Sequence, residues 1–272
     1  MPLSWPQILL RYTALCLLAL LCVFPFWWTL VTALSSSGEI FSYPPAIWPE
    51  QASLANFKEV FAVIPMWQFL QNSVLITFSC VASKLLFCSL AAYPLSRLRF
   101  SGRKLVLGII LATMILPSEI NFLVNFITIN RLHLDDSVLG VIAPNIVSAV
   151  SIFMLKQAFD EIPADLIAAA RLDGASDWRI FWHISLPLAA PWLATVAILG
   201  AVEAWNDYLW PSIVLSKPES LPLAAGILYL RGTFGSNTRV IAAGTVLTVL
   251  PVLLAFIASQ RFFMRGMDGA VK

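Results

Sequence analysis

Six long apolar runs divide this chain, and each is long enough to cross the hydrocarbon core of a bilayer. They cover about residues 12–34, 70–95, 105–129, 137–157, 187–210 and 239–263. A membrane-crossing helix needs roughly 20 mostly apolar residues, and only helices or closed barrels satisfy their backbone in lipid. The runs do not alternate between apolar and polar residues, which favours helices. The sequence therefore predicts an all-α integral membrane protein with six transmembrane helices.

The composition supports this class and argues against several others. The chain is 59% hydrophobic and 12% charged, whereas soluble domains have about 25% charged residues. The net charge is +2, without a basic cluster for nucleic acid. No linker or repeat divides the sequence, so we predict one membrane domain over residues 1–272.

We expect neither a metal site nor catalysis in this chain. The cysteines lie inside apolar runs, where we interpret them as small buried hydrophobic residues: Cys16, Cys22, Cys80 and Cys88. The two histidines, His133 and His183, are far apart. There is no G-x-x-x-x-G-K-[ST] loop, so the chain does not cradle ATP in that way. We therefore expect no enzyme activity and no cofactor of its own.

The loop charges predict the orientation in the membrane. The loop after the second run contains Arg97, Arg99, Arg103 and Lys104 and no acid. By the positive-inside rule, this loop, the loop between the fourth and fifth runs, and both termini face the cytoplasm. The first run exceeds the 7–15 apolar residues of a signal peptide, so we expect it to be retained as a span.

The polar segment between the fourth and fifth runs is predicted to form two short helices, over about residues 163–184. Pro163 suits a first helical position, and Gly174 suits the left-handed residue that ends a helix. Ser176 is expected to cap the second helix, which Pro187 would stop. The small side chains of Ala168, Ala169 and Ala170 leave a surface against which another protein can pack closely.

This segment resembles the EAA loop of ABC-importer permeases. The matching positions are Ala169, Ala170, Gly174, Ile184, Leu186 and Pro187, whereas Ala168 stands where the motif has Glu. Further matches are Asn56-Phe57, Asn72-Ser73, 91–97, 205–211, 260–266 and 269–272. From about residue 50 onward, the chain resembles the second permease subunit of carbohydrate-type ABC importers, similar to the maltose and glycerol-3-phosphate systems.

The resemblance implies a type I permease of a bacterial inner membrane that imports a sugar or sugar-like solute. Its expected partners are a sister permease, two cytoplasmic ATPase subunits that hold ATP and Mg, and an extracytoplasmic binding protein. The positions expected to couple to the ATPase are Asp165, Ala168, Ala169, Ala170, Asp173, Gly174, Arg261 and Arg265. The loop at about 212–238 is expected to probe the binding protein.

The replacement of the motif Glu by Ala168 leaves two alternatives. Asp165, one turn earlier on a similar face of the helix, can partly take over its role. Alternatively, the sister permease carries the Glu and the coupling is asymmetric.

Polar side chains inside the spans are the candidates for a solute path, because ionisable groups in lipid are costly and usually functional. At 1.5 Å per residue, Glu119 and Glu203 lie roughly 21 Å and 24 Å from the cytoplasmic side, and Asn145 roughly 12 Å from the outer side. Further amides close to these positions are Asn121, Asn125 and Asn206, with Phe122, Phe126 and Trp205 beside them. Such groups suit the hydroxyls and faces of a sugar.

The alternative for these polar residues is hydrogen bonding between subunits. Lys84, in the middle of the second span, can pair with an acid or snorkel, and we favour a structural role for it.

Two other functions remain open at this stage. A stand-alone secondary transporter or channel explains the spans and buried acids, but not an EAA-like helix. A membrane-embedded transferase would need acids or histidines clustered at one membrane face, whereas the acids here are scattered. Copurification of an ATPase subunit separates these classes. The solute is also open among a disaccharide, a glycosylated osmolyte and a glycerol-phosphate ester.

Overall fold

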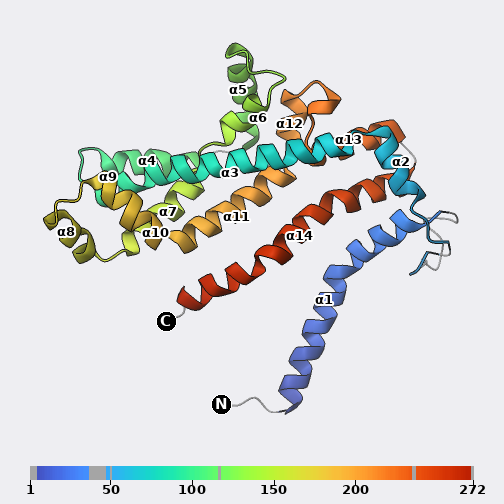
Figure 1. Ribbon diagram of the computed structural model, residues 1–272, viewed down its shortest axis with the longest axis horizontal. Coiled ribbons are helices and arrows are strands. Elements are labelled where there is room, and N and C mark those ends of the chain that lie inside the picture. Colours follow the sequence, from blue (N-terminus) through green and yellow to red (C-terminus); the bar gives the residue numbers. More distant parts are fainter. Residues whose placement is uncertain (1–4, 37–46, 50, 116–117, 235–236, 271–272) are drawn as a thin grey trace. The chain divides into compact units, whose positions relative to one another are not determined.

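The computed structural model describes residues 5–36, 47–49, 51–115, 118–234 and 237–270 (Figure 1). Over these ranges the chain is helical and has no strand, apart from one isolated antiparallel bridge between Ser35 and Ala52. The predicted all-α class is therefore confirmed. The chain divides into two compact units, residues 1–66 with 226–272, and residues 67–225.

The first unit is built around the last helix, α14 (Thr238–Ala270). Both α1 (Trp5–Leu34) and α2 (Ala55–Val63) pack against it. Gly244 of α14 makes room for Leu230 of α13 (Leu223–Phe234), since a Cβ at Gly244 would lie 2.6 Å from the Leu230 Cδ1. The buried Asn56 amide donates to the carbonyls of Ala33 and Ser35, at 2.8 and 3.0 Å. It thereby satisfies acceptors at the C-terminal end of α1.

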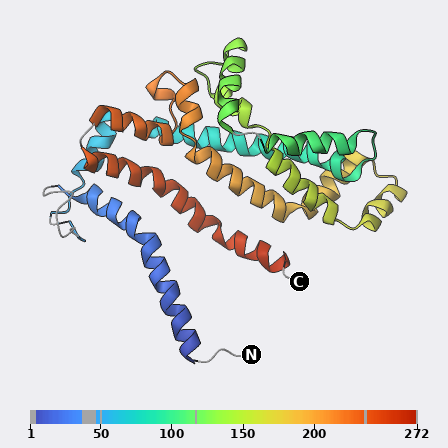
Figure 2. The same cartoon turned by 180° about the vertical axis from the view of Figure 1, so that it is seen from behind.

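The second unit contains the remaining helices. In chain order these are α3 (Met66–Arg97), α4 (Arg103–Thr113), α5 (Ser118–Arg131), α6 (Val138–Ile142), η1 (Ala143–Asn145), α7 (Ala149–Glu161), α8 (Ala164–Leu172), α9 (Asp177–Ile180), the π-helical turn η2 (Phe181–Ser185), α10 (Leu186–Leu188), α11 (Ala190–Asn206), α12 (Leu209–Val214) and η3 (Pro218–Ser220). Figures 1 and 2 show α3 running along this unit beside α7 and α11, with α8 and α9 at one end.

Two apolar clusters hold the second unit together. The larger joins the C-terminal half of α3 to α7, η2 and α11, and Tyr93, Phe159 and Phe181 lie at its centre. The Tyr93 ring lies 5.7 Å from Phe159 and 5.1 Å from Phe181 between centroids. The smaller cluster joins α3, α5, α6 and α12 around the buried Trp210. Aromatic contacts of this kind stabilise a core beyond their buried area.

The observed helices agree with the predicted spans in place but not always in continuity. Within the described residues, α1 and α3 are each long and apolar enough to cross a membrane. Two further candidates are bent: 138–145 with 149–161 by 50°, and 177–188 with 190–206 by 75°. The predicted span 105–129 corresponds to α4 and α5, with residues 116–117 outside the described part. Six spans therefore remain a prediction.

Two expectations were wrong. Pro187 does not stop a helix: it lies in the first turn of α10, where its missing N–H is tolerated, and the bend comes at Ala189. Cys16 and Cys22 are exposed on α1 rather than buried, whereas Cys80 and Cys88 are buried. An exposed apolar face is expected for a helix that contacts lipid.

Candidate functional site

The second unit contains a cavity of about 410 Å³ between α3, α5, η1 and the end of α11. Its lining residues are Cys80, Lys84, Asn121, Phe122, Asn125, Pro144, Asn145, Glu203, Ala204, Asn206, Asp207 and Trp210. Five of the six residues predicted to border a solute path are therefore neighbours in space: Asn121, Asn125, Asn145, Glu203 and Asn206. The side chain of the sixth, Glu119, lies outside the described residues.

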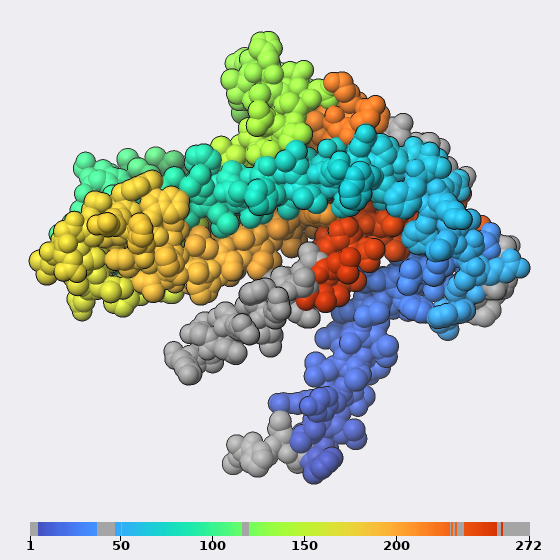
Figure 3. Space-filling model, viewed as in Figure 1, coloured from blue at the N-terminus to red at the C-terminus, as the bar shows by residue number. Residues whose placement is uncertain are grey.

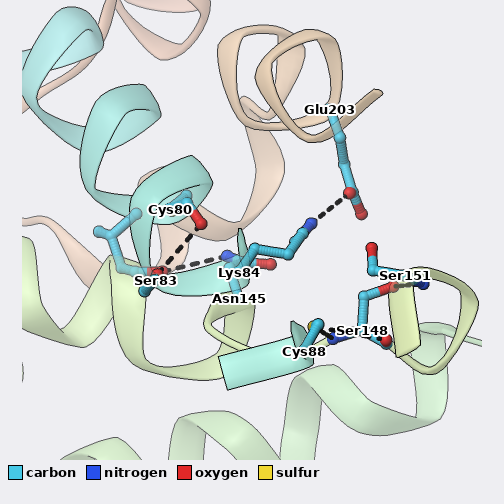
Figure 4. A network of polar contacts seen from close by, with 9 residues as sticks. Cys80, Ser83, Lys84, Cys88, Asn145, Ser148, Ser151 and Glu203 are labelled. Carbon is cyan, nitrogen blue, oxygen red and sulfur yellow. Dashed lines mark hydrogen bonds and ion pairs between the residues drawn. The ribbon is translucent and has the colours of Figure 1, made fainter. Parts of the chain in front are cut away.

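An ion pair between α3 and α11 forms part of the cavity wall (Figure 4). The Lys84 Nζ lies 2.7 Å from the Glu203 Oε2. The Lys84 side chain is 5% exposed, whereas that of Glu203 is 66% exposed. Gly200, one turn before Glu203, lies beside the lysine stem, because a Cβ there would lie 3.4 Å from the Lys84 Cδ. Of the two alternatives for Lys84, pairing with an acid is the one observed, at a place that also borders the cavity.

The amide side chains in the cavity wall are oriented by their own helices. The Asn145 Nδ2 donates to the carbonyl of Val141 at 3.1 Å, and the Asn206 Nδ2 donates to that of Val202 at 2.8 Å. Each of these two amides uses one N–H in this way, so its second N–H and its carbonyl oxygen remain for another group.

The cavity also has an aromatic side. Phe122 of α5 stacks with Trp210 of α12, with centroids 6.1 Å apart and an interplanar angle of 22°. The Trp210 indole donates to the carbonyl of Gly140 at 3.2 Å. Of the three aromatic residues named with the predicted path, only Phe122 lines this cavity, and Phe126 and Trp205 do not.

Six cavity residues were not named with the predicted path: Cys80, Lys84, Pro144, Ala204, Asp207 and Trp210. The Asp207 carboxylate accepts from the backbone N–H of Trp210 at 3.2 Å, at the start of α12. An aspartate followed by an apolar helical turn is a capping signal that the sequence contained.

The two predicted coupling helices are present at the far end of the same unit (Figure 3). Gly174 has φ +81°, and the N–H of Ala175 donates to the carbonyl of Ala170 at 3.0 Å. The Ser176 side chain accepts from the Arg179 N–H and caps α9. Both capping predictions are confirmed. Pro163 precedes α8 as its N-cap residue, one position earlier than predicted.

The surface of this helix pair combines small and apolar side chains. Ala168 and Ala169 are exposed, whereas Ile167 is 4% exposed and anchors α8 to the larger apolar cluster. Trp178 is 61% exposed and Leu172 89% exposed. A surface of this kind suits contact with another protein more than contact with water.

The end of α3 fastens the segment that leads into α8. The Arg97 guanidinium donates to the carbonyls of Phe159 and Ile162 at the C-terminal end of α7. Beside it, the Ser96 hydroxyl donates to the Asp160 carboxylate at 2.5 Å. The last carbonyls of a helix lack partners within the helix, and a cation there is favourable. The side chains of Arg261 and Arg265, predicted to form a second coupling contact, lie outside the described residues.

Comparison with known proteins gives the family. The family model described as "Binding-protein-dependent transport system inner membrane component" matches residues 84–269, which is more than half of the chain. The chain belongs to this family. Its EAA-like segment and most of the cavity lie inside the matched region.

Relatives of this permease cover most of its length. It is 35% identical to the arabinooligosaccharides transport system permease protein AraQ of Halalkalibacterium halodurans, over 82% of this chain and 81% of that protein. It is 31% identical to the sn-glycerol-3-phosphate transport system permease protein UgpE of Yersinia pestis, over 93% of each chain. It also resembles a chain of a crystallised bacterial ABC transporter that imports the acidic polysaccharide alginate, with a TM-score of 0.82, 26% identity, and coverage of 97% and 100%.

Asp136 joins two loops of the permease. Its carboxylate accepts from the backbone N–H groups of Ser216 and Lys217, at 3.0 and 3.4 Å, and pairs with the Lys217 ammonium at 2.9 Å. The hydrogen bond from Lys217 holds the pKa of Asp136 below its usual value. A carboxyl group with a lowered pKa stabilises the folded state above its unfolded pKa of about 4, and this contribution is lost as the pH falls through the folded pKa.

We predict that Asp136→Asn loosens these loops at neutral pH. Asn tolerates the positive φ of 50° at this position, so the variant removes the charge without adding backbone strain. Hydrogen exchange of residues 214–217, followed by mass spectrometry, should become several-fold faster at pH 7. Asp135→Asn, which removes an exposed neighbouring charge, serves as the control. Equal exchange in both variants would show that the ion pair does not hold the loops.

Proposed function

We propose that this permease is one of two membrane subunits of an ATP-driven importer for a sugar or sugar-like solute. In this assignment the cavity forms part of the solute path, and the α8–α9 helix pair couples it to cytoplasmic ATPase subunits that hold ATP and Mg. Both termini and the helix pair lie in the cytoplasm of a bacterial cell. A sister permease and an extracytoplasmic binding protein complete the system.

The observation that carries this proposal is the clustering of polar groups in the cavity. Five residues from three separate helical segments line it, although each comes from a largely apolar stretch of sequence. Polar groups at membrane depth are costly unless they serve a path or a partner. Carboxylates and amides next to the Phe122–Trp210 pair are the combination that a solute with hydroxyl groups and apolar faces requires.

The helix pair supports the coupling role. It is well ordered by two caps and by the Arg171–Asp177 ion pair at 2.8 Å, yet much of its surface is exposed. The positions assigned to ATPase contact are Asp165, Ala168, Ala169, Ala170, Asp173 and Gly174, with Arg261 and Arg265 in the tail. The exposed carboxylate of Asp165, in the first turn of α8, is a charged group about one turn before Ala168, which stands at the position of the motif Glu.

The names of the relatives agree with a sugar-like solute. They comprise permeases for arabinooligosaccharides and for sn-glycerol-3-phosphate, and the solved relative serves alginate import. The family description itself specifies dependence on a binding protein.

Purification of the tagged permease from its native host tests the proposal. We expect a sister permease and an ATPase subunit to copurify with it. The ATPase activity of the complex should rise several-fold when its binding protein is loaded with an oligosaccharide from a panel that also contains amino acids and peptides. Truncation before Gly266 should weaken the association, because it removes the part of the cytoplasmic tail that follows Arg261 and Arg265. Solute uptake driven by an ion gradient, without any ATPase subunit, would instead establish a secondary transporter.

A further inference from the structure

The cavity wall contains more negatively charged side chains than positively charged ones. Among the described side chains that line it, the charged ones are one ammonium, Lys84, and two carboxylates, Glu203 and Asp207. The ammonium is committed to Glu203 at 2.7 Å. The described wall therefore carries a net negative charge and offers no unpaired cation.

The amide groups and the exposed carboxylate of the wall provide further hydrogen-bonding groups. The amides of Asn145 and Asn206 each commit one N–H to the carbonyl four residues earlier, which leaves one N–H and the oxygen of each amide available. Glu203 is largely exposed, so one of its oxygens is available in addition to the one that binds Lys84. Because carboxylates only accept hydrogen bonds and the Lys84 ammonium is bound to Glu203, the charged groups of the wall favour hydrogen-bond donors on the solute.

We propose that the Lys84–Glu203 ion pair makes this cavity selective for uncharged, hydroxyl-rich solutes and against anionic ones. Sugar hydroxyls supply such donors. A phosphate or carboxylate brings acceptors and negative charge, meets Glu203 and Asp207, and finds the Lys84 ammonium already neutralised. Such like-charge contacts are unfavourable and act against an anionic solute.

The relatives do not decide this property. Arabinooligosaccharides are uncharged, whereas glycerol-3-phosphate and alginate are anions. The inference rests on the proposed function, because it names the charge class of the solute for the same cavity. Lys84 acts as a positioning residue: its buried stem lies against Gly200 and holds its ammonium on Glu203.

The test compares two trisaccharides of equal length, arabinotriose and trigalacturonate, which differ in charge. Equilibrium binding of each is measured on the complete transporter in lipid nanodiscs, without the binding protein, so that only the membrane path is probed. We expect the wild type to prefer arabinotriose. Glu203→Gln keeps the shape but frees the Lys84 ammonium, so the relative affinity for trigalacturonate should rise about tenfold.

Lys84→Met should move the preference in the opposite direction, because it leaves Glu203 without its neutralising partner. A purely structural role would change the binding of both trisaccharides in the same proportion. Asp135→Asn removes a negative charge outside the cavity and should leave the preference unchanged. Should Lys84→Met fail to assemble, Asp207→Asn replaces it as the second variant, and it should shift the preference toward trigalacturonate.

The outcomes distinguish a failure of the charge selection from a failure of the sugar assignment. A wild type that prefers trigalacturonate, or variants that leave the preference unchanged, would overturn the charge selection while the sugar assignment stands. A wild type that binds neither trisaccharide, in a complex whose ATPase responds to an amino acid or peptide, would overturn the sugar assignment and this inference with it.

Discussion

Replacing Gly174 by valine is expected to lower solute uptake about tenfold, because a penalty of one or two kcal/mol changes a conformational equilibrium by about 5–30-fold. Gly174 joins α8 to α9 with φ +81°. In that conformation a residue with a side chain costs about 1–2 kcal/mol, and a β-branched residue is among the worst. No atom lies within 4 Å of a Cβ built at Gly174, so the penalty falls on the backbone alone.

The measurement is uptake together with solute-stimulated ATPase activity in proteoliposomes. We expect the valine variant to insert into the membrane but to lose the link between hydrolysis and uptake. Gly174→Asn is the matched control, since asparagine tolerates the left-handed conformation and should retain most of the activity. Normal uptake by Gly174→Val would contradict the proposal that this helix pair couples the permease to the ATPase.

Replacing Arg97 by methionine is expected to destabilise the attachment of the coupling helices. The variant leaves the carbonyls of Phe159 and Ile162 without their guanidinium donor, beside side chains that are 0% and 6% exposed. The Phe159 carbonyl keeps a hydrogen bond of 3.4 Å from the Ile162 N–H, whereas the Ile162 carbonyl loses its side-chain partner, and an unpaired buried acceptor costs about 1–3 kcal/mol. We therefore expect several-fold less ATPase subunit to copurify, together with faster proteolysis between residues 160 and 190.

Two further variants test whether the effect comes from the guanidinium donors of Arg97. Arg99→Met removes an exposed arginine two residues further on and should have little effect. Arg97→Lys keeps the charge but lacks the planar fork of donors, so it should rescue only in part. If as much ATPase subunit copurifies with Arg97→Met as with the wild type, the apolar cluster alone positions α8.

The local structure of the coupling segment was predictable because its signals are encoded in neighbouring residues. A glycine after an alanine-rich helix and a serine before the next helix specify their turn through backbone and capping preferences. The structure shows both. The function of Pro187 was misjudged because a proline in the first turn of a helix and one that ends a helix look alike in a single sequence.

The cavity was only partly predictable. Depth along each span correctly grouped Asn145 with Glu203, because helical rise is a fixed length per residue. The rotation of each helix about its axis is set by packing against its neighbours, and no periodicity in these nearly uniformly apolar runs reveals it. This explains why Phe126 and Trp205 were expected in the path, whereas Lys84 and Trp210 contribute to the wall.

The 75° bend at Ala189 separates two stretches of helix that have different surroundings. On one side, helical structure continues from α9 through η2 to α10, and on the other α11 runs on to Glu203, about 21 Å further at 1.5 Å per residue. The Trp192 indole, just past the bend, donates to the Glu161 carboxylate of α7 at 3.2 Å. Because α11 is one continuous helix from the bend to Glu203, it connects the coupling helices directly to the Lys84–Glu203 ion pair in the cavity wall.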